Sequence, residues 1–586
     1  MVSFAQLRDA RPGDLDSAWR SWRKLVEHLE QAEDAYQGKF LNGVRSARWK
    51  GADAEAAMRT LLPVRSRIRV TSGEASAVAS VLNSAQGKIQ SAQNELRSAI
   101  SSAESQYLRI GHDGSIDFPD TLPARYANWQ ELQKVAQDIQ GKFVAAVKKA
   151  TVADNEIAGA LRALRPDVLN TKNPLAGLQQ DAGVATKLAG FNPNNIPPSN
   201  LKSPGEVADW WRTLPEEQRH LMMNAYPTKI GWLDGIPSED RDEANRTRLE
   251  SRLTELQAKG GNLSEFESHD LGRLVALNKA ISTYESKGHD LYVLGFDSTT
   301  TTEAEKEDGK GADGRAIVAF GNPDLAKHSA VYVPGTEQDL TKFTDSMDRV
   351  HNLYEATKIF ADGPVSTVAW LGYDAPDEIF FNAASGGYAD AGGPQLNNFI
   401  DGLREAQSTA GNDSAHMTAV GHSYGSTVIG EAARHPENRL PVDDIVVAGS
   451  PGMRVSHAED LGIGANHVWA QEASGDQVPS SGRYLHGSGG LPPIGGLQHL
   501  TGVPNVPSDQ EFGGQRLMTD TEGHGNYWDG EETSGPQKSF EASESLEQQA
   551  KVIAGTHSDR EPHNNPTPYG TGGNEERREK WWQGIS

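Results

Sequence analysis

From about residue 290 onward, short apolar runs alternate with helical stretches, and this alternation restricts the possible folds more than any other feature. The runs are rich in Val, Ile and aromatic residues and read HDLYVLGFD, GRAIVAFG, SAVYVPG, VSTVAWLGYD, HMTAVGHS, VDDIVVAGSP and NHVWAQEASGD. Helix-forming segments follow the third, fourth and fifth of them. Strands of this kind alternating with helices form a mostly parallel sheet that is covered on both faces. The predicted fold class is therefore α/β.

One predicted strand-to-helix turn carries the motif G-H-S-Y-G at residues 421–425. With 60 glycines in 586 residues the motif alone arises readily by chance, but it follows the apolar run 417–420 and precedes a helix-forming segment. In such a turn the serine backbone is strained, flanking small residues avoid clashes, and Oγ is exposed at a helix N-terminus. Ser423 is therefore the predicted nucleophile, with Gly421 and Gly425 as the small residues. A purely structural turn is the alternative.

A serine nucleophile needs a histidine base and an orienting carboxylate, here expected in the order Ser, acid, His. Asp476, just after a predicted strand, is the predicted acid, although a turn-capping role is also possible; Asp520 and Asp529 are weaker candidates. His524, in a glycine-flanked loop before the last helix, is the predicted base. Other histidines after the serine, each of which can equally be a surface residue, are His457, His467, His486 and His499.

An oxyanion formed at such a serine needs two backbone donors. The first is expected from Tyr424, directly after the nucleophile, and the second from the loop after the third strand. That loop reads V-P-G-T-E, so Thr336 is the predicted second donor, with Gly335 allowing close approach; a plain glycine turn is the alternative. No cofactor and no metal is expected for this chemistry.

These residues stand in a series of segments that resembles the actinobacterial α/β-hydrolase family known as DUF1023. The likeness covers about 205–555 and includes, in this order, KIGWLDGIPSEDRDEANR, VYVPGTEQDL, LGYDAP, VGHSYGS, VVAGSPGM, VWAQEASGDQVP and GHGNYWD. The resemblance implies an α/β-hydrolase fold with Ser423, Asp476 and His524 as its triad. It implies no particular substrate.

The region from about residue 13 to 164 is predicted to form long helices. Apolar residues recur there at helical spacing; they are Leu15, Trp19, Trp22, Val26, Leu29, Tyr36 and Phe40, and later Val78, Val81, Leu82, Ala85, Ile89, Ala92, Leu96 and Ala99. With Trp49-Lys50-Gly51 between them, the first 110 residues resemble the helical hairpin of WXG100/ESX-type proteins of type VII secretion. An ordinary helical bundle is the alternative, and the Tyr-x-x-x-Asp/Glu export signal is missing because Gly111 stands four residues after Tyr107.

Proline placement suggests the domain boundaries. Residues 1–164 are predicted to be a helical domain, and the Pro-rich stretch 165–205 a linker without regular elements. Residues 206–555 are the predicted hydrolase domain, and the polar stretch 556–586 a loose tail.

Charge and composition exclude several function classes. A net charge of -24 with no basic block disfavours nucleic acid as a partner. The absence of cysteine excludes thiol catalysis, Cys-ligated zinc and disulfides but leaves the compartment open. The start of the chain lacks a signal-peptide core, and no apolar run is long enough for a membrane span. We therefore expect a soluble protein, cytoplasmic or exported without a conventional signal peptide.

Taken together, the residues predict a serine hydrolase, esterase- or lipase-like, that acts through an acyl-enzyme on an ester or acyl substrate. The preference for esters is an expectation from the fold. Two alternatives stay open: a type VII secretion-associated interaction protein or effector with little activity, whose helices self-associate or dock on a secretion component, and a serine peptidase or amidase.

Overall fold

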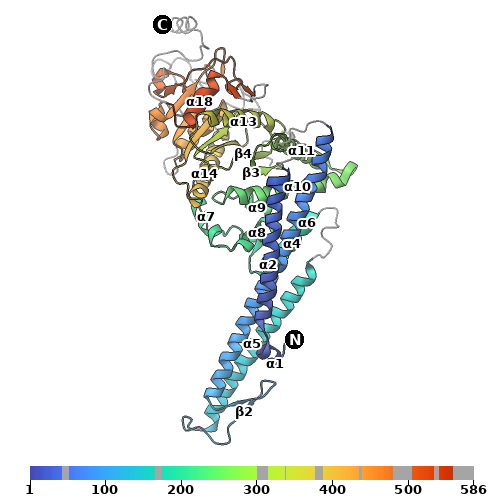
Figure 1. Cartoon of the computed structure of the whole chain (residues 1–586). Coiled ribbons are helices and arrows are strands. Elements are labelled where there is room, and N and C mark those ends of the chain that lie inside the picture. Colours follow the sequence, from blue (N-terminus) through green and yellow to red (C-terminus); the bar gives the residue numbers. More distant parts are fainter. Residues whose placement is uncertain are drawn as a thin grey trace. The chain divides into compact units, whose positions relative to one another are not determined.

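The computed structural model describes most of the chain (Figure 1); the described residues are 1–41, 52–164, 174–299, 314–336, 338–376, 387–434, 439–479, 505–532 and 540–557. They divide into two compact units. The first comprises Met1–Pro198 with Leu214–Pro227, and the second Ser199–Thr213 with the residues from Thr228 onward. The chain therefore passes between the units three times. The Trp49-Lys50-Gly51 turn and nearly all of the predicted tail 556–586 lie outside the described residues.

The first unit is helical, as predicted. Its main helices are α1 (Phe4–Asp9), α2 (Pro12–Ala35), α4 (Ala52–Ser105), α5 (Trp129–Ala163), α6 (Pro174–Leu188) and α8 (Glu216–Ala225). Helix α4 is 54 residues long and packs against α2, α5 and α6. Its apolar stripe around Leu96 buries against α5 residues such as Leu132, Ile139 and Phe143. Burial of these stripes against one another stabilises helices whose isolated stability would be low.

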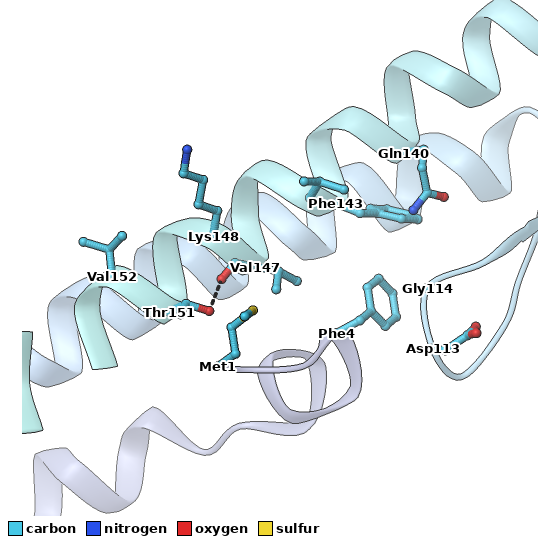
Figure 2. Close-up of a pocket in the computed structure, with 11 residues that line it drawn as sticks. Met1, Phe4, Asp113, Gly114, Gln140, Phe143, Val147, Lys148, Thr151 and Val152 are labelled. Atoms are coloured by element: carbon cyan, nitrogen blue, oxygen red, sulfur yellow. Dashed lines mark hydrogen bonds between the residues drawn. The ribbon is translucent and has the colours of Figure 1, made fainter. Parts of the chain in front are cut away.

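The amino terminus packs onto α5. The ring of Phe4 meets the ring of Phe143 edge-on, with centroids 5.1 Å apart. Gly114, at φ +84°, lets the loop approach Phe4, since a Cβ there would lie 2.6 Å from the ring. Figure 2 shows these residues around a mostly apolar groove of about 440 Å³ that Val147 also lines.

Residues 165–205 were predicted to be a linker without regular elements, and this prediction is wrong for residues 174–188, which form helix α6. Pro174 is the first residue of this helix, where the missing amide hydrogen removes no helical hydrogen bond. Leu175, Leu178, Ala182 and Ala185 then follow at helical spacing and are buried. In the described part of this stretch, the other prolines lie after the helix. The high proline content of the whole stretch was therefore a poor guide to residues 174–188, which form a buried amphipathic helix.

Helix α8 also departs from the predicted boundary at residue 206, since it belongs to the helical unit. Leu221 and Ala225 of α8 share a buried cluster with Ala182, Ala185 and Leu188 of α6. A chain that begins at residue 206 keeps α8 but lacks the helix that covers it.

We therefore expect residues 206–586, expressed alone, to aggregate more than the full chain, because exposed apolar surface promotes association. Size-exclusion chromatography of both proteins measures this, and Leu221→Gln in the short chain should restore part of the monomer. A short chain as monodisperse as the full one would show that α8 does not need its helical partners.

The second unit is built on an eight-stranded sheet, and the predicted α/β class is confirmed. The strands are β3 (Leu291–Asp297), β4 (Arg315–Phe320), β5 (His328–Val333), β6 (Val365–Leu371), β7 (His416–His422), β8 (Asp444–Ala448), β9 (Val468–Gln471) and β10 (Gln515–Arg516). Their order is β10-β9-β8-β7-β5-β6-β4-β3. Neighbours from β10 to β6 are parallel, whereas β4 is antiparallel to β6 and β3 to β4. Strands β5, β6 and β8 are buried along their whole length, which explains their continuous apolar sequences.

Helices cover both faces of this sheet. They are α10 (Ser238–Lys259), α11 (Glu265–Ser286), α13 (Phe343–Phe360), α14 (Gly387–Thr409), α15 (Tyr424–Ala433) and α18 (Glu544–Ile553), and α7 (Pro204–Thr213) packs against α14. Right-handed crossovers place α13 on one face and α14 and α15 on the other, because the chain crosses the sheet in opposite directions at these connections. Helix α18 packs beside α13 (Figure 1), and α14 packs against α15. Among the described helices, none combines the length and apolar content that crossing a bilayer requires.

Candidate active site

Ser423 stands between β7 and α15, in the middle of the sheet. Its backbone has φ 52° and ψ -127°, a conformation that residues other than glycine rarely adopt. The Ser423 amide donates to the Ala448 carbonyl of β8 at 3.0 Å, which ties the turn to the neighbouring strand. The residue is 3% exposed. This is the strained strand-to-helix turn that the sequence motif predicts.

The two glycines of the motif are required by close packing. A Cβ on Gly425 would lie 2.1 Å from the carbonyl oxygen of Val333, at the end of β5. A Cβ on Gly421 would lie 2.9 Å from Ile429 of α15. Any larger side chain at either position would push the helix away from the strands that hold the turn.

Asp476 and His524, which follow β9 and β10, meet at the same edge of the sheet. His524 Nδ1 lies 2.9 Å from Asp476 Oδ2 and 3.0 Å from Oδ1. The Asp476 carboxylate also accepts a 2.6 Å hydrogen bond from the Tyr527 hydroxyl and a 2.9 Å bond from the Val478 amide. Burial by itself would raise the pKa of Asp476, but the bonds from His524 and Tyr527 outweigh it and hold that pKa below its ordinary value. The Asp476 carboxylate is therefore ionised at neutral pH.

The pair lies directly beside the nucleophile turn. A Cβ on Gly449, the residue after Ala448, would lie 2.6 Å from Asp476 Oδ2 and 2.9 Å from His524 Nδ1. Within the described residues, the His524 ring makes no hydrogen bond to the Ser423 hydroxyl; its ring nitrogens have hydrogen-bond contact with Asp476 alone. In unliganded enzymes this link is often long and shortens when substrate binds. With Nδ1 held by the carboxylate, Nε2 is the nitrogen that can take up a proton.

The competing candidates are engaged elsewhere. Asp520 accepts from the Ser545 amide in the first turn of α18, and Asp529 makes no bond to His524, both residues being described. His467 bonds to Asp444, and His457 faces Asp460. His486 and His499 lie outside the described residues.

Sequence reasoning missed His422, which supports the loop of His524. Its Nε2 lies 2.7 Å from the His524 carbonyl oxygen, and its Nδ1 lies 3.2 Å from Arg349 Nη1. Because guanidinium can only donate, Nδ1 must accept and Nε2 must carry the proton. Burial, and then the charge of Arg349, hold the pKa of His422 well below its ordinary value. The neutral His422 ring, protonated on Nε2, therefore connects Arg349 of α13 and the residue before Ser423 to the loop of His524.

The loop after β5 lies against the nucleophile. A Cβ on Gly335 would lie 2.6 Å from Ser423 Cβ and 3.2 Å from its Oγ. The Tyr373 hydroxyl donates to the Pro334 carbonyl at 2.8 Å and lies 3.4 Å from that of Gly335. In a trans peptide the carbonyl and the next amide point in opposite directions, so the Thr336 amide points away from Tyr373. The predicted close approach of the loop backbone to Ser423 is therefore present at Gly335.

Tyr527 was not predicted either, although it stands only three residues after His524. Its hydroxyl accepts from the Ala473 amide at 2.8 Å while donating to Asp476. The residue is fully buried, so the hydroxyl fixes the orientation of the carboxylate.

We expect Tyr527→Phe to lower kcat/KM by about tenfold, because the ring is kept while a hydrogen bond to a charged group is lost. Steady-state kinetics on an activated ester measures this. Tyr226→Phe is the matched control, since among the described residues its buried hydroxyl has no hydrogen-bond partner. Equal activity of Tyr527→Phe and the unmodified protein would show that Asp476 is held without Tyr527.

Comparisons with known proteins agree with this architecture. The sequence model of a family described as Alpha/beta hydrolase matches residues 308–485, a span that contains Ser423 and Asp476. The uncharacterized protein Rv2079 of Mycobacterium tuberculosis is 29% identical over 377 residues, which cover 59% of this chain and 55% of that protein. Rv0963c of the same organism is 39% identical over 117 residues, covering 20% of this chain and 41% of that protein.

This chain thus spans about half the length of the first curated relatives that it matches. Their names state no activity, so the chemistry has to be argued from the site. The family match, the mostly parallel eight-stranded sheet and the helical region before it show that this chain has the α/β-hydrolase fold.

Proposed function

We propose that this protein is a serine hydrolase in which Ser423 is the nucleophile, His524 the base and Asp476 the orienting acid. The observation that carries the proposal is the strained backbone of Ser423 at a strand-to-helix turn, with the Asp476–His524 pair beside it. A strained, buried serine backbone costs folding free energy, and such strain is concentrated at functional sites.

The roles follow from proton transfer. The serine hydroxyl attacks an acyl carbon while His524 Nε2 takes its proton, and the ionised Asp476 stabilises the imidazolium that forms. The same proton then passes to the leaving group, which departs and leaves an acyl group on Ser423 Oγ. His524 then takes a proton from a water molecule that attacks this acyl-enzyme, and it passes that proton to Ser423 Oγ as the Oγ–acyl bond breaks and the acid is released.

The negative oxygen of each tetrahedral intermediate needs donors close to Ser423. We assign the amides of Tyr424 and Thr336 to this role. Tyr424 is the first residue of α15, and amides in the first turn of a helix point out of its N-terminal end, where negative charge is stabilised. Thr336 follows Gly335, whose backbone lies against Ser423.

The substrate class proposed is a carboxylic ester. Fluorophosphonate labelling of the purified chain tests for an activated serine, and a panel of acyl esters of increasing chain length beside matched amides tests the preference. We expect labelling and ester turnover. Turnover of amides at rates equal to the esters would assign the site to the peptidase or amidase alternative, and no labelling with no turnover would contradict a serine hydrolase.

A further inference from the structure

Away from the catalytic site, two histidine rings face each other near the amino-terminal end of β3, which is an edge strand of the sheet. His289 precedes β3, His351 lies in α13, and the Nε2 atoms of the two rings are 3.1 Å apart. Glu532 ends β11 (Gly530–Glu532), and one of its carboxylate oxygens lies within 4.8 Å of a ring nitrogen of each histidine. The histidine rings pack among Tyr284, Phe320 and neighbouring aromatic rings, whereas Glu532 is exposed.

We propose that His289, His351 and Glu532 bind a divalent transition metal ion, with Zn²⁺ as the ion that fits best. Two imidazoles and one carboxylate form a ligand set that zinc accepts, leaving a fourth position for water. Nothing in the reaction proposed above uses this site.

Hydrogen bonding determines which nitrogen of His351 carries a proton. The Asn352 side-chain Nδ2 donates to the carbonyls of Trp528, at 2.9 Å, and Gly530, at 3.4 Å. Its Oδ1 is therefore the atom that lies 3.3 Å from His351 Nδ1, and as an acceptor it requires a proton on Nδ1. The Nε2 atom of neutral His351 then presents a lone pair toward His289.

On His289, Nδ1 lies 3.8 Å from a carboxylate oxygen of Glu355. A proton on Nδ1 suits this negative neighbour and leaves a lone pair on Nε2 as well. Two lone pairs 3.1 Å apart repel each other unless a cation lies between them. A carboxylate or amide oxygen behind each ligating histidine is the arrangement that orients imidazoles in metal sites.

Ring geometry also favours an ion over a direct hydrogen bond. The ring centroids are 4.7 Å apart and the planes are inclined by 83°. A linear N–H···N bond of the observed length would hold the centroids about 5.3 Å apart, since each lies roughly 1.1 Å behind its nitrogen. An ion about 2.1 Å from both nitrogens would hold the centroids about 4.7 Å apart, with an N–Zn–N angle of roughly 95°. The observed separations of the nitrogens and of the ring centroids thus match those expected for one ion bound by both nitrogens.

Glu532 completes the set from a strand that follows the base in sequence. Asn352, which orients His351, also holds the carbonyls of Trp528 and Gly530, so a bound ion would connect the segment after His524 to α13 and to the residue before β3. The expected consequence is stabilisation of this C-terminal segment.

Titration of chelator-treated, tag-free full-length protein with Zn²⁺ tests the proposal, with Co²⁺ absorption reporting the ligand geometry. We expect one saturable site with a zinc-dependent rise in Tm, lost in His289→Gln and at least tenfold weaker in Glu532→Gln. Glu531→Gln, at the adjacent exposed carboxylate of β11, is the matched control and should bind as the unmodified protein does.

A second group that includes Glu30, Glu216 and His220 lies in the helical unit, so His220→Gln identifies binding there. No saturable binding, binding unchanged in both His289→Gln and Glu532→Gln, or binding lost only in His220→Gln would overturn the proposal. If circular dichroism shows that His289→Gln does not fold, zinc binding by Glu532→Gln tests the proposal instead, because the Glu532 side chain is exposed and is not part of the hydrophobic core.

Discussion

Replacing Ser423 by alanine is expected to abolish ester turnover, with a loss in kcat of about 10³- to 10⁶-fold, and to abolish fluorophosphonate labelling. The covalent step has no substitute in this site, because the acyl group must be held on Ser423 Oγ. Residual rate would come only from the oxyanion donors acting on bound water. Intact-mass spectrometry of the labelled protein, together with steady-state kinetics, measures both effects.

The fold should survive this change. Alanine removes one oxygen from a residue whose backbone amide is tied to β8, and the strained φ is kept by the packing of Gly421 and Gly425. Alanine keeps the backbone contacts that hold the turn. The Tm of Ser423→Ala should therefore stay close to that of the unmodified protein or rise. Ser282→Ala, at a partly exposed serine of α11, is the labelling control. Persistent labelling of Ser423→Ala at full strength would show that another residue reacts.

Replacing Asp476 by asparagine is expected to lower kcat by about 10⁴-fold while the site keeps its shape. The amide of asparagine cannot stabilise an imidazolium and would favour the wrong tautomer of His524. Asp520→Asn is the matched control, because the Asp520 carboxylate accepts a hydrogen bond from the Ser545 amide in the first turn of α18, and an amide oxygen can keep that bond. A larger loss in Asp520→Asn than in Asp476→Asn would reassign the acid.

The same substitution predicts a change in acid stability. The pKa of Asp476 is lower in the folded protein than its ordinary value of about 3.9. The ionised form therefore contributes stability above that ordinary value, and this contribution is lost as the pH falls through the lower, folded-state pKa. Asparagine does not titrate, so the variant should lose less stability than the unmodified protein between about pH 5 and the acid limit. Urea unfolding at a series of pH values measures the difference.

The sequence by itself was enough to establish the fold class and to single out Ser423. Periodic apolar runs specify strands and helices locally, and buried parallel strands leave a strong signal because both of their faces are covered. Gly421 was readable for the same reason, because the atoms that crowd it belong to Ser426 and Ile429, a few residues along the chain, whereas Gly425 packs against Val333 of β5. Proline content, by contrast, was misleading for residues 174–188, where a proline at the first helical position costs nothing.

Other features depended on which distant segments meet. The pairing of His524 with Asp476, rather than Asp520 or Asp529, follows from strands β9 and β10 lying side by side. Tyr527 orients Asp476 across the fold, and the proposed metal ligands His289, His351 and Glu532 come from three separate parts of the sequence. Local patterns report burial and backbone conformation, but a hydrogen-bond partner or a metal ligand is chosen by side-chain positions to within a fraction of an ångström, and only tertiary packing sets those positions.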